Sequence, residues 1–526
     1  MSRLTAVERC HRGRALGVLL SLTAAASAGA RAASQQRPPN ILFIYADDQS
    51  YKTVGCYPEA LPGAHTPNID RLAADGIRFH GAFLGAWCTP SRASILTGRL
   101  PHGIESLRPS EPYPSGVYDP KLCPFWPKVF REKGYVTAQI GKWHTGVDAG
   151  TGRDWDWQVV WNRPKNPKNA GAYYRDQILS FNGEERVEPG YSTDNYSRWA
   201  GEFIRGGHRD PAKPWMLWLC YGAIHGPTTP ADRHKGLHRN TPVREPADIL
   251  PPRPGKPDYL NKTQAWRRAP DGRLVAGASG EAFGDAAGQG SATYQDYIRQ
   301  VQECTRGLDE GVGTVLKALR ESGQLENTLV VYTADQGFAM GEHGFRTKLG
   351  PYDANYRSPL ILSRPGVIPR GKFSPNCVSA PDLIVTLFSQ AGLKLPWKMH
   401  GRDVSALLKD PGRKLSRPVY YEYTGDRFGS DTTRIVSETP DKAQYNNVPW
   451  YFVAREARWK YIRYLTPGVP EELYDLERDP EELVNLAALP AHRSELTRLR
   501  RLAVAEMKRT EAGYVERLPE PTPIGE

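Results

Sequence analysis

The segment from Trp87 to Arg99 reads W-C-T-P-S-R-A-S-I-L-T-G-R and carries the densest chemical pattern in this chain. Thr89 and the proline after it are typical of a helix N-cap and first turn, and Gly98 is typical of a residue just past a helix end. Cys88 is then expected at a helix N-terminus, where free N–H groups and the helix dipole favour an anion, with the positive charge of Arg92 close by. A buried apolar thiol beside a solvated charge is the simpler alternative. The fuller interpretation is a nucleophile next to a bound anionic group.

Oxygen donors follow two apolar runs that are predicted to be strands. Asn40–Ala46 is continuously apolar, as expected of a strand buried on both faces of a parallel sheet, and it ends in Asp47-Asp48. Leu329–Ala334 is similar and ends in Asp335-Gln336-Gly337. Ligands of open α/β sheets gather at the carboxyl ends of strands, so these oxygens predict a cation site. An Asx turn or a helix cap is the alternative for either of the first two aspartates alone.

Basic residues follow two further predicted strands. Tyr135–Ile140 is followed by G-K-W-H, which contains Lys142 and His144, and Trp215–Tyr221 is followed shortly by His225. A surface charge and a hydrogen-bonded core histidine are the ordinary roles of isolated Lys and His residues. Their position after strands favours a place in the site.

The length of 526 residues suits a large domain and a smaller one. Residues 145–213 are expected to form irregular loops, and residues 228–292, rich in Pro, Gly and charge, a lid or insertion near the pocket mouth. The character changes near Leu395, after which a small antiparallel sheet is expected. Further helices and strands are predicted at 66–76, 125–133, 294–321, 419–423, 452–464 and 494–511.

The N-terminus resembles an export signal. Four arginines precede the apolar stretch Ala15–Ala30, and an A-R-A sequence offers a cleavage site, so we predict a signal peptide at 1–32 and a linker at 33–39. A retained N-terminal anchor is the alternative, but the stretch is short for a membrane span, and no stable membrane insertion is expected. The protein is therefore predicted to be periplasmic or secreted. The cysteines left after cleavage do not indicate a disulfide framework, and one or two bridges are the alternative.

Removing residues 1–32, with five Arg and one Glu, changes the formal net charge from +11 to +7. A moderately basic exported protein suits polyanionic partners such as sulfated glycans, although the same excess could serve solubility. Clustered basic and aromatic residues of the kind that bind nucleic acid are not evident, so no nucleic-acid partner is expected.

The run C-T-P-S-R-A-S-I-L-T-G-R closely resembles the signature of formylglycine-dependent sulfatases. Four further segments resemble other motifs of that family: N-I-L-F-I-Y-A-D-D, T-P-N-I-D-R-L-A, G-K-W-H and the closing E-L-Y-D-L-E-R-D-P. The resemblance spans nearly all of residues 40–490. It implies the α/β fold of the alkaline phosphatase superfamily, a large mixed sheet sandwiched by helices. The implied domains are a catalytic domain at 40–394 and a smaller C-terminal α+β subdomain at 395–526.

The resemblance also implies cofactors and roles. A maturation enzyme would oxidise Cys88 to formylglycine, whose hydrate is the nucleophile, and Ca²⁺, with Mg²⁺ as second choice, would bind an oxygen-rich site. The implied metal ligands are Asp47, Asp48, Asp335, Gln336 and the group at Cys88. The implied catalytic residues are Cys88, Arg92, Lys142, His144, His225 and Lys348. Gln336 departs from the family's usual His or Asn, Asp353 stands where relatives usually have Glu, and His343 is expected to be structural.

The resemblance implies hydrolysis of sulfate esters, and by analogy with the family the expected substrates are sulfated saccharides. His225 with Lys348 would protonate the leaving oxygen, and His144 would take the proton from the second hydroxyl of the hydrate. Two alternatives remain. The same fold could hydrolyse phosphate or phosphonate esters, or the protein could bind sulfated glycans without catalysis.

Overall fold

The computed structural model describes residues 37–105, 124–277 and 293–522. The chain divides into Met1–Arg37 and Pro38–Glu526, and all elements below belong to the second unit. The predicted signal peptide lies outside the described residues. Among the described helices, none combines the length and apolar character needed to cross a membrane.

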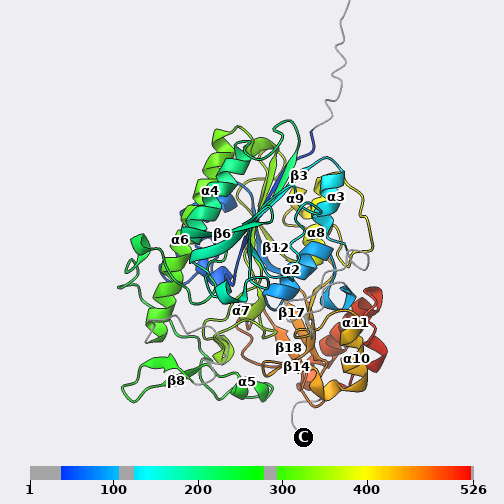
Figure 1. Ribbon diagram of the computed structural model, residues 1–526. Helices are drawn as coiled ribbons and strands as arrows, with labels where there is room; N and C mark the ends of the chain where they lie inside the picture. The colour runs from blue at the N-terminus through cyan, green and yellow to red at the C-terminus, as the bar shows by residue number, and fades with distance from the viewer. Residues whose placement is uncertain (1–36, 106–123, 278–292, 523–526) are drawn as a thin grey trace, which may run out of the picture. The chain divides into compact units, whose positions relative to one another are not determined.

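A ten-stranded mixed sheet forms the centre of this unit (Figure 1). Its middle strands β10, β1, β7, β3 and β4 run parallel to one another, and the outer pairs include antiparallel ones. In spatial order the strands are β12 (Lys372–Ser379), β2 (Ile77–Phe83), β11 (Leu360–Ser363), β10 (Thr328–Ala334), β1 (Asn40–Ala46), β7 (Trp215–Cys220), β3 (Val136–Trp143), β4 (Trp157–Asn162), β5 (Arg175–Phe181) and β6 (Glu184–Tyr191).

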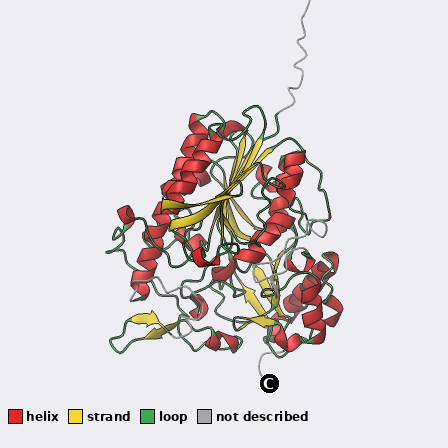
Figure 2. Cartoon of the chain, viewed as in Figure 1, coloured by secondary structure: helices red, strands yellow, loops and turns green. Residues whose placement is uncertain are grey.

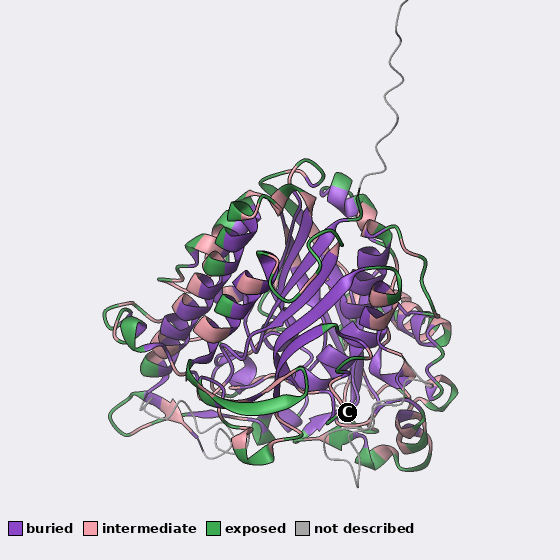
Figure 3. Cartoon of the chain, turned by 45° about the horizontal axis from the view of Figure 1, so that its top comes forward, coloured by how far each residue is buried: buried purple, intermediate pink, exposed green. Residues whose placement is uncertain are grey.

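Helices cover both faces of the sheet (Figures 1 and 2). Alternate residues of β1 point to opposite faces, so Leu42 and Ile44 join one buried cluster and Ile41 and Phe43 join the other. The first face packs against α1 (Pro67–Ala74), α4 (Ser192–Ile204) and α6 (Tyr294–Glu321). The second packs against α2 (Cys88–Thr97), α3 (Trp126–Glu132), α8 (Ala380–Gln390) and α9 (Ser405–Lys409). Figure 3 shows the central strands buried and the outer helix faces exposed.

A smaller antiparallel sheet follows in the C-terminal part. Its strands are β13 (Val419–Tyr423), β16 (Tyr451–Arg455), β17 (Trp459–Tyr464) and β18 (Glu472–Asp475), accompanied by α10 (Ser430–Glu438), α11 (Arg493–Arg509) and the hairpin β14 (Gln444–Tyr445) and β15 (Val448–Pro449). The remaining elements are α5 (Tyr259–Lys262), α7 (Asp353–Tyr356) and the hairpin β8 (Trp266–Arg268) and β9 (Leu274–Ala276). The predicted fold class, a large mixed sheet sandwiched by helices with a smaller α+β subdomain, is confirmed.

The expectation of irregular loops at 145–213 is wrong. This segment supplies β4, β5, β6 and α4, and so extends the main sheet at one edge. A two-residue turn, Asn182-Gly183, joins β5 to β6, and both residues have positive φ (48° and 102°). An Asn-Gly pair is the strongest short hairpin signal in a sequence, but the exposed polar strands beside it lack the apolar alternation that would have revealed them.

The helix of the cysteine segment begins earlier than predicted. Trp87 is its N-cap and Cys88 its first residue, whereas Thr89 was expected to be the cap. The Thr89 hydroxyl instead donates to the carbonyl oxygen of His144, 3.0 Å away. Gly98 ends the helix in the left-handed conformation, at φ 68°, as a C-terminal glycine should.

Gly141 is required by the approach of two central strands. Its φ is +100°, and an added Cβ would lie 1.9 Å from the carbonyl oxygen of Cys220 on β7. Gly134, just after α3, has a similar φ of +89° but no heavy atom within 4 Å of an added Cβ. The two glycines therefore share the conformational requirement and differ in packing.

We expect Gly134→Ala to lower the free energy of unfolding by about 1–2 kcal/mol, the cost of a left-handed L-residue. Gly141→Ala should lower the free energy of unfolding by a further ~1–3 kcal/mol, because the added methyl group forces β3 away from β7. Urea titrations of both variants measure the difference. Equal losses of unfolding free energy in the two variants would show that the close approach at Gly141 does not contribute to stability.

Candidate active site

Three buried carboxylates meet at the ends of two adjacent parallel strands. β1 and β10 pair in register up to Ala46 and Ala334, so Asp47 and Asp335 leave the sheet side by side. The backbone N–H of Asp48 donates to Asp335 Oδ1 at 2.9 Å, which ties the two strand ends together. All three carboxylates are buried. The strand ends therefore concentrate negative charge at one point inside the protein.

Cys88 faces this point from the first turn of α2. Its thiol donates to Asp47 Oδ1 at 3.4 Å. The ammonium groups of Lys142 and Lys348 lie 3.4 Å and 3.3 Å from the sulfur, and the side-chain nitrogen of Gln336 lies 3.8 Å away. The position of the sulfur is thus flanked by cations and carboxylates and lies at a helix N-terminus.

Each carboxylate is paired with one cation. Lys142 forms an ion pair with Asp47, and Lys348 contacts both oxygens of Asp48 at 2.8 Å. Arg92, fully buried on α2, donates to Asp335 Oδ2 at 2.9 Å. Buried charges persist when they are paired, so these pairs hold the cluster together.

Burial and mutual repulsion shift the pKa values of the cluster. Burial raises the pKa of Asp48 to about 6, and burial together with Asp47 raises that of Asp335 to about 7. Burial alone would raise the pKa of Asp47 as well, but Lys142 and other nearby cations hold it well below its usual range. Burial, followed by Asp47, raises the pKa of the Cys88 thiol to about 12. An unmodified thiol here is neutral at physiological pH and is a poor nucleophile.

His225 lies beside Asp48 and an unexpected tyrosine. Its Nε2 is 3.5 Å from Asp48 Oδ2 and 3.0 Å from the hydroxyl of Tyr173, while its Nδ1 is 2.6 Å from the carbonyl oxygen of Gly226. The contact with Gly226 requires a proton on Nδ1, which leaves Nε2 as the acceptor of the tyrosine O–H. Burial, reinforced by Lys348, lowers the pKa of His225 well below its usual range, so the imidazole is neutral.

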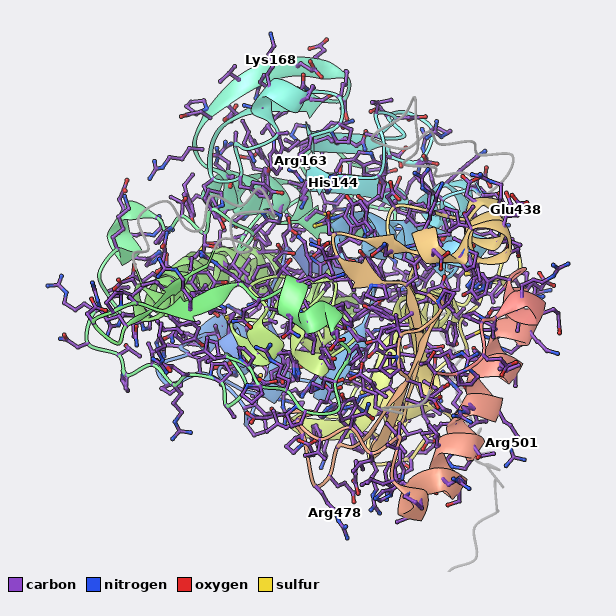
Figure 4. All side chains as sticks on the ribbon, turned by 90° about the horizontal axis from the view of Figure 1, so that it is seen from below. His144, Arg163, Lys168, Glu438, Arg478 and Arg501 are labelled. Atoms are coloured by element: carbon purple, nitrogen blue, oxygen red, sulfur yellow. The ribbon has the colours of Figure 1, made fainter. Side chains whose placement is uncertain are left out.

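His144 lies at the edge of the cluster next to Arg163 (Figure 4). The nearest guanidinium nitrogen is 3.3 Å from Nε2 and 3.4 Å from Nδ1. Burial, with Arg163 as the next cause, lowers the pKa of His144 well below its usual range. The ring is therefore neutral and able to accept a proton.

Tyr173 and Arg163 are site residues that sequence reasoning missed. The Tyr173 hydroxyl lies 3.4 Å from Lys142 Nζ, and its ring stacks on His225 with centroids 4.0 Å apart. Both residues come from the segment predicted to be irregular. The Asn-Gly turn that marks the β5–β6 hairpin was the available signal that this segment is part of the sheet.

Two other residues singled out in the sequence lie outside the cluster. His343 has its Nδ1 2.6 Å from Asp248 Oδ2 and its ring against Tyr352, so its contacts are structural. Asp353 is buried between Arg455 and Lys460, each 2.9 Å away. The other ten side chains predicted for the site lie in the cluster or at its edge.

The donor atoms suit a hard divalent cation. Ligand atoms of Asp47, Asp48, Cys88 and His225 lie within 4.8 Å of one another. The carbonyl oxygen of the Gln336 side chain is buried and has no hydrogen-bond partner among the described residues, as expected of an acceptor that binds a cation. Asp335 borders the group, although its oxygens already accept hydrogen bonds from Asp48, Gln336 and Arg92. Carboxylate and amide oxygens are the ligands preferred by Ca²⁺.

Arg92→Met should lower the free energy of unfolding by about 3–5 kcal/mol, because it leaves Asp335 buried without its counter-ion. Arg71→Met is the matched control, since Arg71 makes a bond of similar length to Asp75, 2.8 Å against 2.9 Å, on a surface helix. Removing that exposed pair should cost less than about 1 kcal/mol. Urea denaturation compares the two, and a loss at Arg92 as small as at Arg71 would contradict the electrostatic account.

Comparison with known proteins agrees with this site. The sequence model of the family described as Sulfatase matches residues 39–393, and a second, described as N-sulphoglucosamine sulphohydrolase, C-terminal, matches residues 341–509. The chain is 28% identical to an N-acetylglucosamine-6-O-sulfatase of Bacteroides thetaiotaomicron over 86% of this chain and 83% of the relative. It is 29% identical to human arylsulfatase A over 90% of this chain and 87% of the relative.

Solved structures show the same fold. A protein in complex with its substrate D-glucosamine-2-N,6-O-disulfate superposes with a TM-score of 0.74 at 26% identity, covering 90% of this chain and 98% of that one. The phosphonate monoester hydrolase of Agrobacterium radiobacter superposes with a TM-score of 0.64 at 21% identity, covering 90% of this chain and 96% of the other, a likeness of fold alone. Because the family model spans well over half of the sequence, the chain belongs to the sulfatase family and is a sulfuric ester hydrolase.

Proposed function

We propose that this exported sulfatase removes sulfate from saccharides, using formylglycine formed from Cys88 and a bound Ca²⁺. The observation that carries the proposal is the place of Cys88, the first residue of a buried helix within 3.4 Å of both lysines and a carboxylate. A nucleophile at this position would meet an anionic headgroup held by cations and by helix N–H groups.

The group at position 88 supplies the nucleophile. A neutral thiol is poorly suited to attack sulfur, whereas a hydrated aldehyde offers a hydroxyl and can later collapse to release sulfate. Asp47 lies beside this group and can orient it and accept a hydrogen bond from it. Lys142 and Lys348 flank the same point, and their charges would stabilise the ester oxygens as negative charge develops.

The metal would be held by Asp47, Asp48, Asp335, Gln336 and the group at position 88. The unpaired oxygen of Gln336 and the excess of carboxylate oxygens support Ca²⁺ over softer ions. At these ligands Ca²⁺ would supply Lewis-acid stabilisation of the sulfate oxygens. Arg92 would act indirectly, because its ion pair with Asp335 keeps that carboxylate charged and fixed in place.

Proton transfer falls to the lysine and the two histidines. Lys348 Nζ lies 3.3 Å from the sulfur position and contacts Asp48, and His225 Nε2 lies on the same carboxylate, so Lys348 would donate the proton to the leaving oxygen with His225 beside it. His144 is neutral, the form that a general base needs, and would accept the proton of the second hydroxyl.

Two observations support the proposed substrate class: the names of the relatives and the net charge of the exported protein. The relatives include enzymes named N-acetylglucosamine-6-O-sulfatase and Delta 4,5-hexuronate-2-O-sulfatase. The basic charge that remains after removal of residues 1–32 is consistent with a polyanionic saccharide.

A maturation enzyme would have to act on Cys88 before folding is complete, because the thiol is buried afterwards.

Cys88→Ser should reduce turnover of 4-nitrophenyl sulfate by about 10³-fold or more, because the hydroxyl of serine cannot regenerate an aldehyde. Cys56→Ser, at a half-buried cysteine outside the cluster, should leave turnover unchanged. Mass spectrometry of the peptide containing residue 88, from a host that matures sulfatases, should find the aldehyde. A fully active Cys88→Ser protein, or faster hydrolysis of the matching aryl phosphate or phosphonate, would refute the proposal.

Removing divalent metal should lower the thermal stability and abolish turnover, since the buried oxygens of Asp47, Asp48 and Gln336 lose the ion that they would share. Ca²⁺ at about one hundred times its dissociation constant should restore about 2.7 kcal/mol. Gln336→Ala should weaken this response, while Gln139→Ala, at a buried glutamine outside the cluster, should keep it. Thermal unfolding with and without Ca²⁺ tests this, and a protein indifferent to chelation would contradict the metal site.

A further inference from the structure

Arg163 is a surplus cation at the edge of the site. The three carboxylates of the cluster are matched by Lys142, Lys348 and Arg92, which leaves none for a fourth positive charge. Within the described ranges, no Asp or Glu oxygen lies at ion-pair distance from Arg163, whose contacts are Ala170, His144 and two aromatic rings. A cation held in a catalytic pocket without a carboxylate is available to an anionic ligand.

The guanidinium of Arg163 is held in a fixed orientation. Its Nε donates to the carbonyl oxygen of Ala170 at 2.8 Å, and its central carbon lies 4.8 Å from the ring centre of Tyr173 and 5.6 Å from that of Trp161. One terminal nitrogen faces His144, and the other makes no hydrogen bond with the part of the chain that the structure describes. A fixed guanidinium loses little entropy on binding and can grip a carboxylate or sulfate with two parallel bonds.

Tyr173 connects Arg163 to the residues around Cys88, because its ring contacts the guanidinium and its hydroxyl contacts the cluster. The same tyrosine whose ring lies under Arg163 reaches Lys142 and His225 with its hydroxyl. Arg163 also lies beside His144, and Lys168 of the same loop lies farther out (Figure 4). The ester sulfate is served by the lysines near Cys88, so a ligand of Arg163 must be a different group on the same substrate.

We propose that Arg163 binds a second anionic group of the substrate, a carboxylate or an N-sulfate, and makes the enzyme prefer sulfated sugars that carry two negative groups. This inference rests on the proposed hydrolysis of sulfated saccharides and names their class more narrowly. The carboxylate of a uronic acid and the N-sulfate of a glucosamine share the planar or trigonal oxygen array that a guanidinium recognises.

Two substrate pairs separate the sources of the second charge. The first is D-glucosamine-2-N,6-O-disulfate against N-acetylglucosamine-6-O-sulfate, and the second is an unsaturated hexuronate-2-O-sulfate against its methyl ester. In the mature protein, kcat/KM should favour the doubly charged member of at least one pair by ~10–100-fold, the range expected of hydrogen bonds to charged groups. Arg163→Gln should abolish that preference, because it should lower kcat/KM for the doubly charged member at least about tenfold more than for the singly charged member.

Lys168→Ala is the matched control, because it removes an equal charge from an exposed position of the same loop. It should keep the preference, whereas Arg163→Lys should keep part of it. Calorimetric titration of the same ligands into a Cys88→Ala variant measures binding without turnover. If the mature protein hydrolyses none of these esters, the proposed function is refuted. The titration still shows whether Arg163 binds the second anionic group. Equal losses on both members of each pair in Arg163→Gln, with a displaced pH profile, would show that Arg163 acts through His144 alone and would overturn the inference. So would a wild-type protein without preference in either pair.

Discussion

Three carboxylates buried at one point are the constraint on which this structure depends. Asp47, Asp48 and Asp335 repel one another in a region that water does not reach, and burial raises the pKa of Asp48 and Asp335. Such a group persists only if positive charge is supplied. Lys142, Lys348 and Arg92 supply it from three different elements, and the same cations are the ones an ester sulfate would meet.

The fold brings these charges together by simple means. Parallel strands β1 and β10 end side by side, so their terminal carboxylates are neighbours without any long connection. The strand β3 delivers Lys142 next to them, at a close approach to β7 that requires Gly141. The helix α2 contributes both Cys88 at its N-terminus and Arg92 one turn later. Rigid elements therefore position the first contacts of the site, and the loops after them contribute His225 and Lys348.

Sequence reasoning succeeded where one short segment holds both the strand and the chemistry. The apolar run that ends in Asp47 reveals its burial and its carboxylates together, and the Cys88 segment reveals a helix start and an anion site in the same residues. It failed for Arg163 and Tyr173, because their place depends on how β4 and β5 join the sheet edge. Arg163 and Tyr173 lie in the segment between these two strands, and nothing local in it predicts that they will meet Lys142 and His225. The N-cap of the cysteine helix is also two residues earlier than predicted, at Trp87, and the Thr89 hydroxyl bonds to the His144 carbonyl oxygen instead of capping the helix.

The central claim is that the carboxylates gather around a calcium ion at which sulfate esters are hydrolysed. Elemental analysis of the purified, matured protein, together with its turnover of a sulfate ester before and after dialysis against chelator, tests this most directly. We expect about one calcium per chain, lost together with activity and regained on adding Ca²⁺. Undiminished turnover by protein that contains no divalent metal would contradict the account.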